Sequence, residues 1–500
     1  MDSSVNPAGP LAAVDIGSNS FRLEIGQLPQ ARYRRIDYHK ETVRLGAGLD
    51  ASGMLTEDAA QRGLACLRRF SARLAGFESG QVRAVATQTL REASNRDAFL
   101  LRAQEALGFP IEVISGREEA RLIYAGVAHL QPSNEPRLVI DIGGRSTELI
   151  LGQGSTPLVA ESFGVGCVSL SLRFFEDGCL TAEAFRAAQV AAGAELEEAL
   201  QLFAPHRWRQ ALGSSGTAGA VSQLLKAAGV TDGTITPAAL RWCMQRCIEG
   251  GHIDRIQIEG LKGDRRAVLP GGLAILYTLA ANFHIENLLP AKGALRQGVI
   301  IDLHERLQSL RSKSPRDVRD DTVAELQRRF HADPAQAARV ASIALGLFDA
   351  VMPDAEPDTR RELGWACALH ELGLMVSHHD HHRHSAYLLA HADAPGFSQS
   401  QQRRVGDLVL AQRGGLRKVE PQLASETFAW QVLCLRLAYI KCHARGEVDP
   451  QALALRAKGR DALLVYSSGW ADSHPRTLFL LREETTAWGR IGPLRLVLPG

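Results

Sequence analysis

The sequence predicts an α/β fold with a duplicated core, followed by a mainly helical part. A strand, a turn of small residues and a second strand are expected at residues 11–27 and again at 138–153. Through residue 310, strand-like and helix-like runs alternate, as they do in sheets covered by helices. Beyond residue 311, apolar residues recur with helical spacing.

The two strand pairs have similar sequences. LAAVDIGSNSFRLEIGQ at 11–27 and LVIDIGGRSTELILGQ at 138–153 align at an offset of 126 positions, with seven identities over thirteen positions. Shared turn chemistry explains part of this similarity, because Asp-x-Gly before small residues favours any tight turn. The alternative is a duplicated domain. Turn glycines let a ligand approach the backbone and successive N–H groups attract anions, so two such turns can bind one phosphate from opposite sides.

An aspartate ends the first strand of each repeat, Asp15 in one and Asp141 in the other. Mg²⁺ prefers one or two carboxylates together with phosphate oxygens and water. The repeats therefore predict a site for phosphate and Mg²⁺.

Other segments extend the α/β pattern. A strand followed by a helix is expected at 81–95, 111–127 and 210–221, and a buried helix at 269–281. In 111–127 the helix begins near Gly116 and carries acids in its first turn.

Composition narrows the functional classes. A chain of 500 residues predicts two to four domains, and a net charge of +2 gives no support for a nucleic-acid partner.

The first residues do not resemble a signal peptide, and no apolar run reaches the about 20 residues that span a bilayer, so stable membrane insertion is not expected. Eight cysteines without a secretory signal favour reduced thiols in a cytoplasmic protein. Cys243 and Cys247 are expected to pack in the core.

Six short segments occur in the order of a known family. They are DIGSNSFRL at 15–23, ATQTLREASN at 86–95, ISGREEARLIYAGV at 114–127, DIGGRSTEL at 141–149, GSSGT at 213–217 and KGALRQGVI at 292–300. With them the chain resembles the exopolyphosphatase and guanosine pentaphosphate phosphatase (Ppx/GppA) family of the actin, sugar kinase and Hsp70 superfamily. The resemblance implies a duplicated actin-like, ribonuclease H-like core, a helical HD-like domain and a small C-terminal β-containing module. The expected boundaries are 1–10 for a flexible lead, 11–134 and 135–310 for the two actin-like subdomains, 311–445 for the helical domain and 446–500 for the last module.

The same resemblance implies a phosphohydrolase that cleaves a terminal phosphoanhydride bond. The water would be activated by Glu119, with Glu118 as its neighbour, because a carboxylate near the attacking water can accept its proton. Adjacent helical residues point about 100° apart, so only one glutamate can face a cleft, and we expect Glu119 to do so. Without the resemblance, both acids also fit a helix N-terminus.

The remaining site residues follow from the resemblance. Asp141 and Glu148, with Asp15 close by, are the expected metal ligands. The expected ion is Mg²⁺, with Mn²⁺ as an alternative and K⁺ as an additional candidate. The expected phosphate contacts are Ser18, Asn19, Ser20, Arg91, Gly143, Gly144, Arg145, Ser146 and Thr147.

Arg145 departs from the family pattern, which usually has a third glycine there. The side chain can point to solvent or add a positive contact to a long polyanion. Arg145 aligns with Asn19, and asparagine tolerates left-handed turn geometry better than arginine. The shape of the second turn is therefore open.

The second half contains a histidine cluster. Five of the sixteen histidines lie between His378 and His384, downstream of His370 and Glu371. A metal site is one interpretation, but the His-Asp pair of HD phosphohydrolases reads His370-Glu371 here. We expect a degenerate HD-like fold that serves architecture or polyanion binding. The basic excess at 401–461 can line a polyphosphate channel or be a solvated face.

Two substrates and one further class stay open. In its length and in the run HRHSAYLL the chain resembles the long exopolyphosphatases, which favours inorganic polyphosphate. Guanosine pentaphosphate (pppGpp) is the alternative, because it shares the terminal anhydride and length does not exclude it. A non-hydrolytic actin-like nucleotide-binding protein would have similar loops. Family resemblance also suggests a homodimer.

Overall fold

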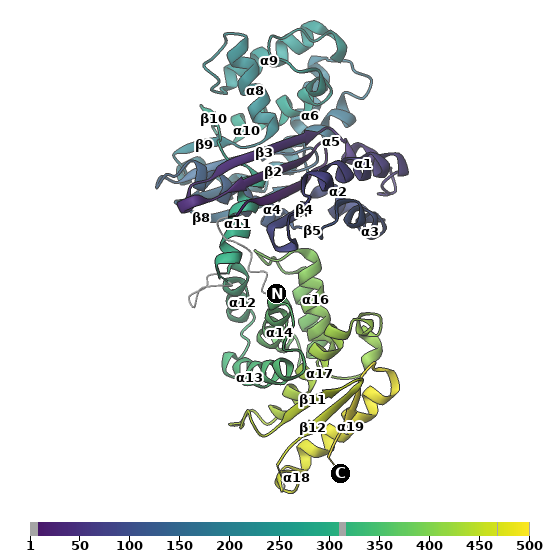
Figure 1. The fold of residues 1–500 in the computed structure, drawn as a ribbon. Coiled ribbons are helices and arrows are strands. Elements are labelled where there is room, and N and C mark those ends of the chain that lie inside the picture. The colour runs from purple at the N-terminus through teal and green to yellow at the C-terminus, as the bar shows by residue number, and fades with distance from the viewer. Residues whose placement is uncertain (1–8, 310–316, 468, 500) are drawn as a thin grey trace. The chain divides into compact units, whose positions relative to one another are not determined.

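The computed structural model describes residues 9–309, 317–467 and 469–499 (Figure 1). The chain divides into two compact units, residues 1–315 and 316–500. Of the expected flexible lead, residues 1–8 lie outside the described residues, as do residues 311–316 of the charged segment expected to separate core and helical domain. The finer domain boundaries stay predictions.

The first unit contains two five-stranded sheets of the same topology. Their orders are β3-β2-β1-β4-β5 and β10-β9-β6-β7-β8, so β6 to β10 repeat β1 to β5. The strands of the first sheet are β1 Leu11–Ile16, β2 Phe21–Gln27, β3 Arg34–Glu41, β4 Val82–Ala86 and β5 Ile111–Val113. Those of the second are β6 Arg137–Ile142, β7 Thr147–Gln153, β8 Thr156–Phe163, β9 Gln210–Gly213 and β10 Leu288–Pro290.

The register confirms the predicted duplication. Asp15 pairs with Arg22 across β1 and β2, and Asp141 pairs with Glu148 across β6 and β7, at positions 126 residues apart. The register between the second and third strands of each sheet shifts between Ile25 and Gly26 and between Leu151 and Gly152, again at equivalent positions. The predicted α/β class with actin-like sheets is therefore correct.

Helices cover these sheets, with α8, α9 and α10 grouped beyond the second sheet (Figure 1). Their bounds are α1 Glu57–Arg73, α2 Gln88–Glu92, α3 Arg96–Leu107, α4 Gly116–Leu130, α5 Cys167–Phe174, α6 Ala182–Leu196, α7 Ala199–Leu202, α8 Gly216–Ala227, α9 Pro237–Gly250, α10 Leu269–Asn282 and α11 Leu295–Ser309. The strand and helix expected within each of 81–95, 111–127 and 210–221 are present, and Cys243 and Cys247 of α9 are buried.

One apolar cluster joins the two sheets. It contains Leu11 and Ala13 of β1, Val139 of β6 and Ile150 of β7, together with apolar residues of α4 and α11. Burial of apolar surface stabilises this arrangement. The two strand turns are thereby held on one side of the unit, facing each other.

The second unit is mainly helical and ends in a small sheet of order β11-β12-β13. Its helices are α12 Val318–Arg329, α13 Pro334–Val351, α14 Pro357–Leu369, α15 His381–His391, α16 Gln399–Ala411, α17 Glu426–Lys441, α18 Trp470–Ser473 and α19 Pro475–Ile491. The strands are β11 Ala454–Lys458, β12 Asp461–Val465 and β13 Arg495–Val497. Among the described residues, no helix is both long and apolar enough to cross a membrane.

Candidate active site

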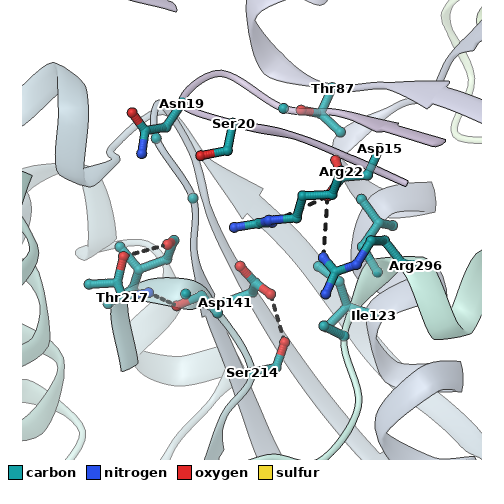
Figure 2. A pocket seen from close by; sticks show the side chains of 18 of the residues that line it. Asp15, Asn19, Ser20, Arg22, Thr87, Ile123, Asp141, Ser214, Thr217 and Arg296 are labelled. Atoms are coloured by element: carbon teal, nitrogen blue, oxygen red, sulfur yellow. Dashed lines mark hydrogen bonds and ion pairs between the residues drawn. The ribbon is translucent and has the colours of Figure 1, made fainter. Parts of the chain in front are cut away.

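A cavity of about 300 Å³ lies in the first unit between the two strand turns. Residues 17–20 of the β1–β2 turn line one side, and Gly143, Gly144 and Ser146 of the β6–β7 turn line the other. In Figure 2, Asp141 and Ser214 approach the cavity from one side, and Arg22 and Arg296 approach it from the opposite side. The sequence repeat therefore brings both predicted turns to one cavity.

A side chain at the turn glycines would be crowded. A Cβ at Gly17 would lie 3.0 Å from the Ser20 carbonyl oxygen, and a Cβ at Gly144 would lie 3.0 Å from Ser18 Cβ. Asn19 and Arg145 have negative φ, as do the glycines of both turns. The left-handed backbone geometry that we considered for Asn19 and Arg145 is therefore absent from both turns.

Asp15 and Asp141 occupy equivalent positions but have different partners. Asp15 Oδ2 lies 3.2 Å from Arg22 Nη1 and 3.5 Å from Arg296 Nη1. Asp141 Oδ2 instead accepts a hydrogen bond from the Ser214 hydroxyl at 2.6 Å. Burial raises the pKa of Asp141, and the charge of Asp15 adds to this effect.

Glu148, a predicted metal ligand, is fully buried and is not among the residues that line the cavity. Its Oε1 accepts from the Ser162 hydroxyl at 2.7 Å, and its Oε2 is buried without a hydrogen-bond partner among the described residues. Burial, together with the charges of Glu119 and Asp141, raises the pKa of Glu148 well above its ordinary value.

These carboxylates fit a magnesium site. A hard cation would satisfy the unpartnered Glu148 oxygen and relieve the repulsion between Glu148 and Asp141. Among the described residues, no group of three or more His, Cys, Asp and Glu side chains is arranged to hold a metal. Mg²⁺ would therefore depend on phosphate oxygens and water for the rest of its coordination, as it does in many phosphate sites.

Glu119 lines the cavity and is held by Arg91. The Ser115 hydroxyl caps α4 by accepting from the Glu118 N–H at 3.1 Å, which places Glu119 in the first turn. Arg91 Nη1 donates to Glu119 Oε2 at 2.8 Å and to the Ile114 carbonyl at 3.0 Å. Burial raises the pKa of Glu119 to about 7, with Arg91 opposing the rise. A carboxylate with this pKa can take a proton from water near neutral pH.

Glu118 lies away from the cavity, as helix geometry requires if its neighbour faces it. Its Oε2 accepts from Arg121 Nε at 2.7 Å, and Arg121 and Arg83 also pair with Asp302 at 2.5 and 2.6 Å. Glu118 is fully buried in this network. The geometry gives Glu118 an ion-pairing role, and a part in catalysis stays a prediction.

Two predicted phosphate contacts also point elsewhere. Arg145 pairs with Glu92 at 2.7 Å, and the Thr147 hydroxyl donates to the Val165 carbonyl at 2.6 Å. Neither residue lines the cavity. Arg91 contacts the cavity only through Glu119 in this structure. Ser18, Asn19 and Ser20 all line it, and the Ser20 hydroxyl is buried without a partner among the described residues.

Six basic side chains line the cavity, and none was singled out from the sequence as a site residue. They are Arg22, Arg35, Lys40, Arg265, Lys292 and Arg296. Three of them, Arg22, Lys292 and Arg296, fall inside the motifs that carry the resemblance, which is a signal that could have found them. The other three have no local motif.

Of the five histidines between His378 and His384, only His381 and His382 are buried, as is His370 upstream of them. His370, His381 and His382 are at most 4% exposed, and each has a ring nitrogen without a hydrogen-bond partner among the described residues. Glu371 pairs with Arg445. In the described parts of the chain, these side chains form no group that could hold a metal ion.

The family model described as the Ppx/GppA phosphatase family matches residues 30–307, and the model described as Ppx/GppA phosphatase, domain III, matches residues 318–485. The chain belongs to the Ppx/GppA phosphatase family. A crystal structure of the Aquifex aeolicus member of this family is 25% identical, with a TM-score of 0.50, covering 60% of this chain and 98% of that one. An exopolyphosphatase from Cytophaga hutchinsonii is 23% identical, with a TM-score of 0.54 and coverage of 60% and 98%, and shares the fold. Family membership identifies a phosphatase and leaves the substrate open.

Proposed function

We propose that the protein is an exopolyphosphatase, which hydrolyses the terminal phosphoanhydride bond of inorganic polyphosphate and releases orthophosphate. The observation that carries the proposal is the charge pattern of the cavity. Six basic side chains lie beside three carboxylates, of which Glu119 has a pKa raised to about 7. This pattern suits a highly charged phosphate chain and a water that must lose a proton.

The reaction would proceed by direct attack of water. The water oxygen bonds to the terminal phosphorus, the bridging P–O bond breaks, and the Glu119 carboxylate takes the proton from the water. The shortened chain leaves with the bridging oxygen, whose charge lies near basic groups. Backbone N–H groups of the two turns, together with Ser20, orient the terminal phosphate. Mg²⁺ held by Asp141 and Glu148, with Asp15 close by, would neutralise phosphate charge.

The aromatic content of the cavity favours polyphosphate over a nucleotide. Tyr38 is the only aromatic residue among those that line it. The guanidinium carbons of Arg35 and Arg296 lie 5.2 and 5.3 Å from the Tyr38 ring centre. Because these two guanidinium groups already contact the Tyr38 ring, the ring is poorly available to stack on a base.

One feature favours pppGpp as the second candidate. A smaller cavity of about 210 Å³ adjoins the first and shares Lys40, Gly216 and Arg265 with it. Most of its remaining lining is apolar, including Leu224, Leu261 and Leu269, which suits a base.

The test measures orthophosphate release from long-chain polyphosphate, pppGpp and ATP, side by side, with Mg²⁺ present. The proposal predicts the highest kcat/KM with polyphosphate. Preference for pppGpp would select the second candidate. Release from none of the three, with nucleotide binding retained, would indicate a non-hydrolytic actin-like protein.

A further inference from the structure

Arg145, the residue at which the second turn departs from the family pattern, contacts the other half of the duplicated core. Its Nε and Nη2 lie 2.8 and 2.7 Å from Glu92 Oε2, and its Nη1 donates to the Gly46 carbonyl at 3.2 Å. Arg145 follows β6 of the second sheet, whereas Glu92 ends α2, which follows β4 of the first. The contact therefore ties the second phosphate turn to α2.

From Glu92, hydrogen bonds continue along α2 to the candidate base. Gln88 Nε2 donates to Glu92 Oε1 at 2.6 Å, because residues four apart share a helix face. Gln88 Oε1 accepts from Arg91 Nε at 2.9 Å and from Nη2 at 2.6 Å. The remaining Arg91 nitrogen, Nη1, donates to Glu119 Oε2 at 2.8 Å.

In this series of hydrogen bonds, Glu92, Gln88 and Arg91 are each held by a partner on either side. The Gln88 amide can accept from Arg91 only in the orientation in which its NH₂ group donates to Glu92. Arg145 holds Glu92, a carboxylate next to Arg91 in sequence that would otherwise be free to compete for the Arg91 guanidinium. With Nε and Nη2 of Arg91 held by Gln88, Nη1 is directed at Glu119.

We propose that Arg145 is a positioning residue: through Glu92, Gln88 and Arg91 it orients the Glu119 carboxylate when the two turns are in contact. The inference rests on the proposed function, since it takes Glu119 as the group that accepts the proton of the water. Arg145 thereby links the placement of the phosphate turns to the placement of the base. The pair with Glu92 is partly exposed, with side chains 23% and 34% accessible, and such pairs contribute little to stability.

The experiment measures kcat, KM and the thermal unfolding midpoint for four variants. They are Arg145→Ala, Arg145→Lys, Glu92→Gln and the double variant Arg145→Ala/Glu92→Gln. Arg102→Ala is the matched control, because Arg102 forms a similar two-contact pair with Glu57, at 2.9 and 2.6 Å, between α3 and α1. Glu119→Gln and the wild type are measured alongside, with polyphosphate or whichever substrate the wild type hydrolyses.

We expect Arg145→Ala to lower kcat about tenfold, with KM within about twofold, because misplacing a catalytic group slows the chemical step more than binding. Arg145→Lys should recover part of kcat. The double variant should lose no more than the single ones, and Arg102→Ala should match the wild type.

Three results would overturn the inference: an unchanged kcat in Arg145→Ala, losses that multiply in the double variant, or a rise in KM alone, which would make Arg145 a direct phosphate contact. The proposed function fails by a different result. If Glu119→Gln keeps full activity, or the wild type hydrolyses no phosphoanhydride, the assignment of Glu119 as the base is wrong. This conclusion does not depend on the results for the Arg145 variants.

Discussion

Asp141 and Glu148 face each other across β6 and β7, whereas the equivalent pair across β1 and β2 is Asp15 and Arg22. Directly opposed residues on an antiparallel pair project from the same face of the sheet. The duplication has therefore produced one strand pair whose acid is neutralised by an arginine and one with two acids. The second pair is where a cation would be most strongly attracted.

The acidic pair predicts how magnesium dependence changes. If the two acids hold Mg²⁺ as proposed, Asp141→Asn and Glu148→Gln should each raise the Mg²⁺ concentration for half-maximal phosphate release by at least about tenfold, because each would remove an anionic oxygen ligand. Mg²⁺ titrations of the initial rate measure this concentration. Ser162→Ala is the control, since it removes the hydrogen bond to Glu148 Oε1 but keeps the carboxylate. An unchanged requirement in both acidic variants would exclude them as ligands.

Glu118 should contribute to stability. Glu118→Gln leaves Arg121 and the buried Arg83 with one carboxylate fewer, and breaking a buried ion pair costs about 3 kcal/mol of unfolding free energy. Denaturant unfolding measures the loss. If folded Glu118→Gln instead lost as much kcat as Glu119→Gln, Glu118 would have a catalytic role.

The Glu119 pKa predicts the pH dependence of hydrolysis. A base must be ionised to accept a proton, so kcat/KM should fall as pH decreases through about 7, the value to which burial raises this pKa. Arg91 lowers the pKa, so Arg91→Gln should move this acidic limb to higher pH. Initial rates between about pH 5 and about pH 9 measure the limb. A limb that moves to lower pH in Arg91→Gln would contradict the assignment.

The strand turns were predictable from the sequence because their chemistry is local. Asp15, Gly17 and Ser20 recur at an offset of 126, and a side chain at the turn glycines would crowd atoms within and between the turns. Helix geometry also predicted that only one of two adjacent glutamates faces the cavity. Which one does so came from the resemblance, since both fit a first helical turn.

Contacts between distant segments were not predictable. Lys40 of β3 and Arg265, before α10, reach the cavity from segments more than 200 residues apart, and no spacing rule connects them. Arg145 was expected on the phosphate, but a carboxylate 53 residues away in sequence holds it. The partner of a long charged side chain depends on how the two halves of the core approach each other.

The buried histidines predict acid sensitivity of the second unit. Burial lowers the pKa values of His370, His381 and His382 to about 4, below the unfolded value of about 6.5. The unfolded chain therefore binds more protons between these values, and stability should be lost as pH falls from about 6.5 toward about 4. His381→Gln/His382→Gln should flatten the pH dependence of the unfolding midpoint and still release phosphate at pH 7. Loss of phosphate release together with a bound metal would show a metal site instead.

The most direct measurement is orthophosphate release from long-chain polyphosphate by Glu119→Gln, compared with the wild type and Glu118→Gln at one Mg²⁺ concentration. Removing a general base costs about 10²- to 10⁴-fold in rate. We predict a loss of that size for Glu119→Gln, with polyphosphate binding retained, and a near-wild-type kcat for folded Glu118→Gln. Undiminished release by Glu119→Gln would contradict the role of Glu119 as the base.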